Sequence, residues 1–210
     1  GLHAVASIVF SESPIHTDEH FVQKAKDLVS LGVHGVQLKD SGALLTVDRV
    51  RTLVPALRAA IGDDVDLHLH SHCSSGLGPL VPLEALPLGI DIVHTAISPL
   101  ANGSSQPATE MIMREARNMG FEVPLDDDCL ARQAAHFHSV AKRHGKPVGQ
   151  PVAYDPEIYR HQVPGGMISN MISQMEAIGL GGELPRVLDE IVRIREELGW
   201  PIIVSPLSQF

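Results

Sequence analysis

The sequence has few cysteines, no excess of positive charge and no long apolar run, and each absence excludes a class of protein. Its 210 residues include only two cysteines, which form no CxxC pair and suggest no disulfide framework. A reducing, cytoplasmic setting is therefore expected. The formal net charge of −9 argues against nucleic-acid or anionic-membrane binding. No apolar run approaches the roughly 20 residues that cross a bilayer, so no membrane insertion is expected.

The first half of the chain alternates between short apolar strands and amphipathic helices. Strands are expected at 3–10, 33–40, 65–72 and 90–98, and helices at 17–32, 46–62 and 80–89. Thr17 and Thr46 are candidate N-caps, and Gly32 and Gly62 are candidate helix ends. Strand–helix alternation at this spacing is typical of parallel βα units.

Two architectures fit such units, an open doubly wound sheet and a (β/α)8 barrel. No GxGxxG follows the first strand, so the dinucleotide-binding fold lacks its fingerprint. In a barrel the active site lies at the C-terminal ends of the strands. Here the strands lead into Lys39, into His70 and His72, and into a polar loop at 98–109. The pattern favours a barrel, but a complete one needs about 250 residues, so we expect an α/β fold with half of a TIM barrel.

The second half is expected to be helical. Residues 126–210 would form a helical extension after a partial barrel of residues 1–125. We expect a loop with two short helical stretches at 149–170, and a turn at 161–167 in which glycines allow positive φ. Helices are expected at 126–145 and 184–199, the latter with an apolar face of Val187, Leu188, Ile191, Ile194 and Leu198. Both chain ends resemble abrupt strands, which suggests a fragment of a longer polypeptide.

The stretch "DLHLHSHC" (66–73) carries three histidines at every second position. His68, His70 and His72 would share one face of a strand, roughly 6.5–7 Å apart from one to the next. Two imidazoles at that spacing can converge on one ion, whereas three in a row spread too far. The pair nearest the C-terminal end of the strand, His70 and His72, is the candidate metal pair, and His68 would lie deeper. By itself the pattern leaves a metal site and structural histidines equally open.

Two neighbouring features bear on that choice. Lys39 ends the preceding strand, where it is either a snorkelling lysine with Asp40 as a turn residue or, once carbamylated, an oxygen ligand. The loop "SPLANGSSQPAT" (98–109) offers backbone donors, hydroxyl groups and an amide. Taken alone, the loop is typical of an ordinary turn.

Several stretches together resemble the carboxyltransferase domain of biotin-dependent enzymes, namely pyruvate carboxylase, the α subunit of oxaloacetate decarboxylase and transcarboxylase. They occur in the family's order and span nearly the whole chain. They are "SPIHT" (13–17), "LKDSGALLT" (38–46), "HLHSHCSSG" (68–76), "GIDIVHTAISPLANGSSQPATE" (89–110), "YRHQVPGGMISN" (159–170) and "LGWPIIVSPLSQ" (198–209).

The resemblance implies the C-terminal half of a (β/α)8 TIM barrel followed by a mainly helical extension. It implies a divalent metal (zinc, manganese or cobalt) at the barrel mouth, with carbamylated Lys39, His70 and His72 as ligands. Ser104 stands where the family usually has a threonine that passes a proton between biotin and the keto acid. Ser104 and Gln106 would then contact substrate or biotin, and Lys39 and Ser104 would be the catalytic residues.

The implied reaction is carboxylation of pyruvate or decarboxylation of oxaloacetate. The metal would stabilise an enolate of the 2-oxo acid, and carboxybiotin would carry the CO2. Biotin would arrive on a separate carrier domain, so a biotin carboxyl carrier domain and a biotin carboxylase component are the expected partners. The family tends to form homodimers.

The sequence departs from the family at several points. It reads "KDSGA" for the common KDMAG and "HSHC" for HTHD, so Cys73 replaces an acidic residue and could weaken the orientation of the adjacent ligand. Two roles fit Cys73 at this point: a buried thiol and a fourth metal ligand. The family's aspartate ligand, a glutamine and a substrate arginine would precede Gly1, so the isolated chain is expected to be inactive.

Two alternatives remain at this stage. One is a related metal-dependent aldolase or lyase barrel, similar to HMG-CoA lyase, which also uses an HxH pair. The other is a degenerate, non-catalytic half-barrel with a structural role, which Cys73 would favour. A carbamate on Lys39 would distinguish the carboxyltransferase from both.

Overall fold

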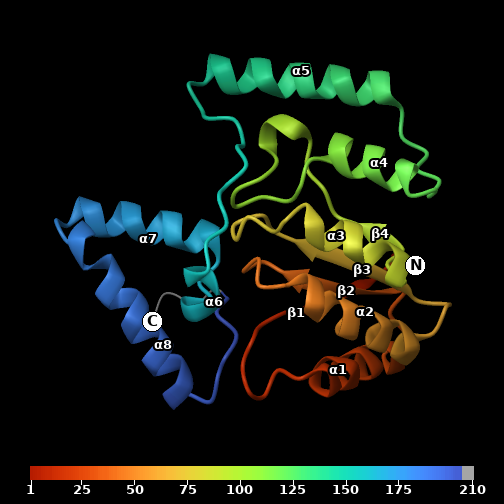
Figure 1. Ribbon diagram of the computed structural model, residues 1–210, viewed down its shortest axis with the longest axis horizontal. Helices are drawn as coiled ribbons and strands as arrows, with labels where there is room; N and C mark the ends of the chain where they lie inside the picture. The colour runs from red at the N-terminus through yellow and green to blue at the C-terminus, as the bar shows by residue number, and fades with distance from the viewer. Residues whose placement is uncertain (205–210) are drawn as a thin grey trace.

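The computed structural model describes residues 1–204, in which a parallel sheet carries helices on its outer side and further helices follow (Figure 1). The sheet has four strands in the order β1-β2-β3-β4. Consecutive parallel strands with helices between them are the arrangement of neighbouring units in a (β/α) barrel, whereas a doubly wound sheet reverses its strand order. The strands are β1 (Val5–Val9), β2 (Gly35–Asp40), β3 (Asp66–Ser71) and β4 (Ile92–Val93).

Each helix of this first part comes after a strand in the sequence. They are α1 (Asp18–Ser30), α2 (Val47–Ile61), α3 (Leu80–Ala85) and α4 (Thr109–Asn118), with short 3-10 helices η1 (Leu86–Leu88) and η2 (Ser98–Leu100). The expected N-caps are confirmed, because Thr17 Oγ1 accepts a hydrogen bond from His20 N and Thr46 Oγ1 accepts one from Arg49 N. Gly62 ends α2 with φ at 74°. The sequence therefore marks the ends of the two longest helices of this part through local contacts alone.

The fourth βα unit differs from the expectation. The strand expected at 90–98 shortens to two residues in β4, because the chain then turns toward the loop and Ala96 bridges to Ala108. Helix α4 was not anticipated. It packs inward through Ile112, Met113 and Ala116.

The core lies between the sheet and the helices on its outer side. Val36 and Leu38 of β2 and Leu67 and Leu69 of β3 are fully buried there, together with residues of α1, α2 and α3. Because side chains alternate along a strand, the intervening residues of β2 and β3 point to the opposite, inner face. That inner face carries the polar residues described below.

The second part consists of α5 (Asp127–Arg143), α6 (Glu157–His161), α7 (Gly165–Ala177), the 3-10 helix η3 (Gly181–Glu183) and α8 (Leu184–Glu197). Figure 1 shows α5 along one side of the molecule and α7 and α8 together on another. Asp126 caps α5, because its carboxylate accepts a hydrogen bond from Cys129 N. None of the helices within residues 1–204 is long and apolar enough to cross a membrane.

Two expectations for residues 149–170 are wrong. Helix α7 has 13 residues and is not a short stretch. Gly165 and Gly166 form its first turn, and the positive φ of this segment is at Gln162 (55°). The helix expected at 184–199 is present as α8. Ile194 on α8 and Leu198 just after it are 41% and 63% exposed, and the buried residue of α8 is Arg195.

Arg195 is buried because its guanidinium joins α8 to the segment after β1. It donates hydrogen bonds to Ser11 Oγ (2.6 Å) and to the carbonyl of Glu12 (3.1 Å). The expected strand at the C-terminal end is not formed at 201–204, and residues 205–210 lie outside the described part of the chain.

Candidate active site

The candidate site lies on the inner face of the sheet, at the C-terminal ends of β2 and β3. The parallel register pairs Lys39 with His70 and Gln37 with His68. Residues paired across neighbouring strands point to the same face, so Lys39 and His70 lie side by side. The register thus places Lys39 and His70 next to each other on the inner face, and His68 lies one step deeper and is buried.

His70 and His72 bring their ring nitrogens together, with the two Nε2 atoms 3.2 Å apart. The Nδ1 of His72 lies 2.6 Å from the backbone oxygen of Ser104. A carbonyl oxygen only accepts, so the hydrogen of a neutral His72 is on Nδ1. Its Nε2 then presents a lone pair toward His70.

The same reasoning fixes His70. The side-chain amide nitrogen of Gln106 lies 3.2 Å from His70 Nε2, and an amide nitrogen only donates. Neither Nε2 atom therefore carries a hydrogen, so each has the lone pair that a metal requires, with that of His70 accepting from Gln106 in the metal-free chain. Two imidazole nitrogens that each bind one ion at about 2.0–2.1 Å are separated by about 3 Å, so the pair fits a divalent metal.

The two histidines are only part of a metal shell. Within residues 1–204, no group of three His, Cys, Asp or Glu side chains is placed to hold an ion. Lys39, which the register places beside His70, can add an oxygen ligand once its amine carries a carbamate. The donor set at this position is thus two imidazoles and one modifiable lysine.

The protonation of the rings suits metal binding. Burial, aided by His72, His94 and Lys39, lowers the pKa of His70 to about 4. Burial also lowers the pKa of His72, against the effect of the Ser104 carbonyl. Both rings are therefore neutral near pH 7, and neutral imidazole is the form that binds a metal.

Cys73, which follows the histidine pair, is a buried thiol. Burial raises its pKa to about 12, so it is a neutral thiol in the metal-free chain. A Cβ on Gly78 would lie 2.2 Å from the Cys73 sulfur, which explains the glycine. The backbone N–H of Cys73 donates to the Ser105 carbonyl (2.9 Å) and so ties the polar loop to β3.

The loop at 98–109 places Ser104 and Gln106 against the histidine pair. Positive φ at Asn102 and Gly103 reverses the chain, and the N–H of Asn102 donates to the Gln106 carbonyl (2.8 Å). The side chain of Ser104 is exposed. A Cβ on Gly165 would lie 3.5 Å from the Ser104 Cβ and 2.5 Å from Ser74 Oγ, so the first turn of α7 packs closely against this loop.

Asp40 has a role that the sequence reasoning missed. It was considered only as a turn residue, but its carboxylate is fully buried. It accepts hydrogen bonds from the N–H groups of Leu44 (2.7 Å) and Leu45 (3.0 Å) and from Ser71 Oγ (2.9 Å). Burial raises its pKa to about 6, although these bonds act in the opposite direction. Asp40 thus fastens the loop after Lys39 to the strand that carries His70.

His94 was also missed. Its Nδ1 lies 3.2 Å from His70 Nδ1, on the far side of the His70 ring from His72. The expected strand at 90–98 would have placed it on the edge next to β3, and that position is the signal that could have revealed it.

Comparison with known proteins shows which proteins the chain is similar to. Residues 158–210 match a family model described as a conserved carboxylase domain. Over 212 aligned residues the chain is 37% identical to a pyruvate carboxylase subunit of Methanocaldococcus jannaschii. The chain is therefore similar to one part of this pyruvate carboxylase subunit. It is also 32% identical, over 209 residues, to the methylmalonyl-CoA carboxyltransferase 5S subunit of Propionibacterium freudenreichii.

Each alignment covers 100% of this chain but only part of the relative. The chain spans 37% of the M. jannaschii protein and 41% of the 5S protein. A solved carboxyl transferase domain of Rhizobium etli pyruvate carboxylase superposes with a TM-score of 0.88 at 24% identity, covering 97% of this chain and 35% of that one. This likeness confirms the expected fold, a partial α/β barrel with helices after it, and the relatives confirm the resemblance noted in the sequence.

Proposed function

We propose that the protein containing this chain is a metal-dependent carboxyltransferase that moves CO2 between carboxybiotin and a 2-oxo acid such as pyruvate or oxaloacetate. One observation carries the proposal. The Nε2 atoms of His70 and His72, neither of which carries a hydrogen, lie 3.2 Å apart, next to Lys39 at the strand ends. The names of the relatives support the substrate class, since they include pyruvate carboxylase and a 2-oxoglutarate carboxylase large subunit from Hydrogenobacter thermophilus, 28% identical.

In this proposal His70, His72 and carbamylated Lys39 hold a zinc, manganese or cobalt ion. A bound ion would supply Lewis-acid polarisation of the 2-oxo group. His72 is oriented for this task by the Ser104 carbonyl, in the way that metal-binding histidines are usually fixed through their second nitrogen.

The polar loop supplies the groups that meet biotin and the keto acid. The exposed Ser104 hydroxyl would carry a proton between the biotin ring nitrogen and the keto-acid carbon. The Gln106 amide, which lies beside His70, would contact the substrate. Both residues sit above the histidine pair, where a small acid could reach the metal and the loop together.

The assembly around the chain is part of the proposal. Residues 1–125 would form the partial barrel and residues 126–210 a helical extension of the same domain. Biotin would arrive on a separate carrier domain, charged by a biotin carboxylase component, and the protein would form a homodimer. Two free cysteines are consistent with a cytoplasmic setting.

Metal analysis and mass spectrometry test the proposal. We expect about one metal ion per chain and a carbamate on Lys39, with the metal lost in His70→Ala and His72→Ala. The matched control is His138→Ala, on the exposed surface of α5, which should retain the metal. The metal-loaded full-length protein should also exchange CO2 between oxaloacetate and biotin. Metal content that is unchanged in both site variants, or no exchange by the loaded protein, would refute the assignment.

A further inference from the structure

Four histidines form a continuous chain through the site. His72 Nε2 faces His70 Nε2, His70 Nδ1 faces His94 Nδ1, and His94 Nε2 faces His68 Nδ1, each at 3.2 Å. The His70 and His94 rings are nearly perpendicular, at 87°, as are the His68 and His94 rings, at 81°. Only the first contact belongs to the metal pair, so His94 and His68 require a separate explanation.

The positions of the ring hydrogens in these histidines can be deduced one after another, starting from His70. Gln106 donates to His70 Nε2, so the hydrogen of neutral His70 is on Nδ1. The group that faces this hydrogen is His94 Nδ1, which must therefore be its acceptor. His94 then carries its own hydrogen on Nε2 and donates it to His68 Nδ1.

At the other end of the four histidines, the His68 ring is packed against the backbone. The hydrogen of His68 is left on Nε2, which is buried and has no hydrogen-bond partner among the described residues. A Cβ on Gly35 would lie 3.0 Å from that nitrogen, so the ring sits against the backbone of β2. An unpaired buried N–H costs free energy, whereas an apolar side chain at this position would not carry that cost.

We propose that His94 is a positioning residue that holds His70 in the tautomer and ring orientation needed for metal binding, and that His68 fixes the tautomer of His94 in turn. The inference rests on the metal site of the proposed function. Groups that accept the second N–H of a metal-binding histidine are usually carboxylates, carbonyls or waters, and here the acceptor is a third imidazole. His94 does not share the ion, because it contacts the opposite nitrogen of the His70 ring.

The test compares three variants of the full chain. His94→Phe keeps a planar ring but removes the acceptor. His94→Asn places its side-chain oxygen close to the position of the Nδ1 atom and so preserves an acceptor. His138→Phe makes the same histidine-to-phenylalanine change on the exposed surface of α5, and circular dichroism would check the folding of all three.

Nitrogen-15 NMR of the metal-free imidazoles is the first readout. In the unmutated chain and in His94→Asn, His70 should be protonated at Nδ1 and bare at Nε2, and in His94→Phe it should become a mixture of tautomers. Competition with a chromophoric chelator for zinc is the second readout. His94→Phe should bind about 10–100-fold more weakly, while His94→Asn and His138→Phe should stay close to the unmutated chain.

The inference is wrong if His70 is protonated at Nε2 in the unmutated chain, if His94→Phe binds zinc as tightly as the unmutated chain, or if His94→Asn is as weak as His94→Phe. Failure of the proposed function looks different. In that case the unmutated chain binds no zinc, while the NMR spectra still report whether His94 sets the His70 tautomer.

Discussion

The sheet with its covering helices and the later helices α5–α8 are stabilised by different interactions. Nearly all of the buried apolar cluster comes from residues 8–90. Of the later helices, α5 buries two residues, and α7 and α8 bury one each. The sheet is thus stabilised by an extensive apolar core, and the later helices depend on a smaller number of specific contacts.

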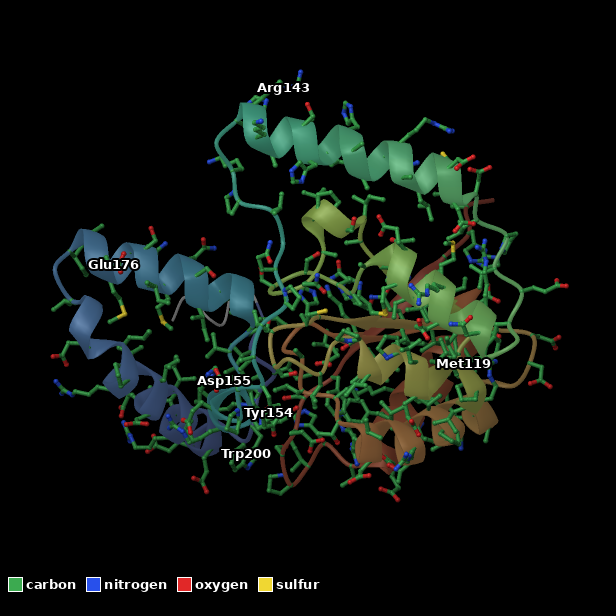
Figure 2. The ribbon with its side chains drawn as sticks, turned by 45° about the horizontal axis from the view of Figure 1, so that its top comes forward. Met119, Arg143, Tyr154, Asp155, Glu176 and Trp200 are labelled. Carbon is green, nitrogen blue, oxygen red and sulfur yellow. The ribbon has the colours of Figure 1, made fainter. Side chains whose placement is uncertain are left out.

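The difference shows how the site is built. The histidine pair and Lys39 lie on strands whose other face is packed into the core, which suits a metal geometry that tolerates little error. Ser104 and Gln106 lie on a loop that contacts the first turn of α7 near Gly165. In Figure 2 the labelled Tyr154 and Asp155 lie where the two parts meet, and the Asp155 N–H donates to the Ser75 carbonyl (3.2 Å). The metal half of the proposed site is therefore on the part with the extensive apolar core, and the substrate half of the proposed site faces the more weakly attached part.

The largest expected effect comes from removing the same side chain in each part. Leu69→Ala deletes a fully buried side chain of β3 and should lower the free energy of unfolding by about 2–5 kcal/mol. Leu198→Ala, at an exposed position just after α8, should change it by less than about 0.5 kcal/mol. Urea denaturation measures both. Equal losses would show that the two parts are held alike and would remove the basis of the comparison.

A smaller effect is expected at the carboxylate that joins the sheet to the site. In Asp40→Asn one side-chain oxygen becomes an amide nitrogen that cannot accept, so a donor among Leu44 N–H, Leu45 N–H and Ser71 Oγ loses its partner. The cost should be about 1–3 kcal/mol. Asp64→Asn, at an exposed aspartate, is the matched control and should be neutral in the same urea denaturation.

The pH dependence of the Asp40→Asn cost sharpens this prediction. Burial raises the pKa of Asp40 from 3.8 to about 6, so between these pH values the folded chain binds this proton more tightly than the unfolded chain. The stability contributed by Asp40 therefore falls as pH rises from about 4 to about 6, and levels off above that. The difference between the unmutated chain and Asp40→Asn should be larger at pH 4 than at pH 8. A difference that grows with pH would mean that the hydrogen bonds outweigh burial.

The comparison also explains what could be predicted from the sequence. The strands and capped helices of the sheet region depend on periodicity and on contacts a few residues apart, which a sequence displays directly. Strand alternation places Lys39 and His70 on the inner face, but their pairing depends on the register between β2 and β3. The expected strand at 90–98 gave the position of His94 beside β3, but not its ring contacts with His70 and His68.

The later helices were harder to predict because tertiary contacts override local signals there. Gly165 and Gly166 are typical of a turn, yet they begin α7, where the close approach of Ser74 leaves no room for a Cβ at Gly165. The apolar pattern at 184–199 includes Leu198, which is 63% exposed, whereas Arg195 is buried through partners more than 180 residues away. Such contacts leave no periodic trace in the sequence.

The smallest expected effect, confined to α8, comes from changing Arg195. Its guanidinium lies 5.5 Å from the centre of the Trp200 ring and donates to the Pro201 carbonyl (3.0 Å) as well as to the segment after β1. Arg195→Lys keeps the charge but loses the planar set of donors. The amides of α8 should then exchange with solvent about fivefold faster, a change of about 1 kcal/mol.

Hydrogen exchange measured by mass spectrometry would locate the change. The amides of β2 and β3 should keep their protection in Arg195→Lys, because their stability comes from the apolar core and not from α8. Arg193→Lys, which alters an exposed arginine paired with Glu190 and Glu197 on the same helix, is the control and should leave α8 unchanged. If Arg195→Lys also exposes the strands, the helices and the sheet unfold as one unit, and the division between a rigid metal half and a weakly attached substrate half does not hold.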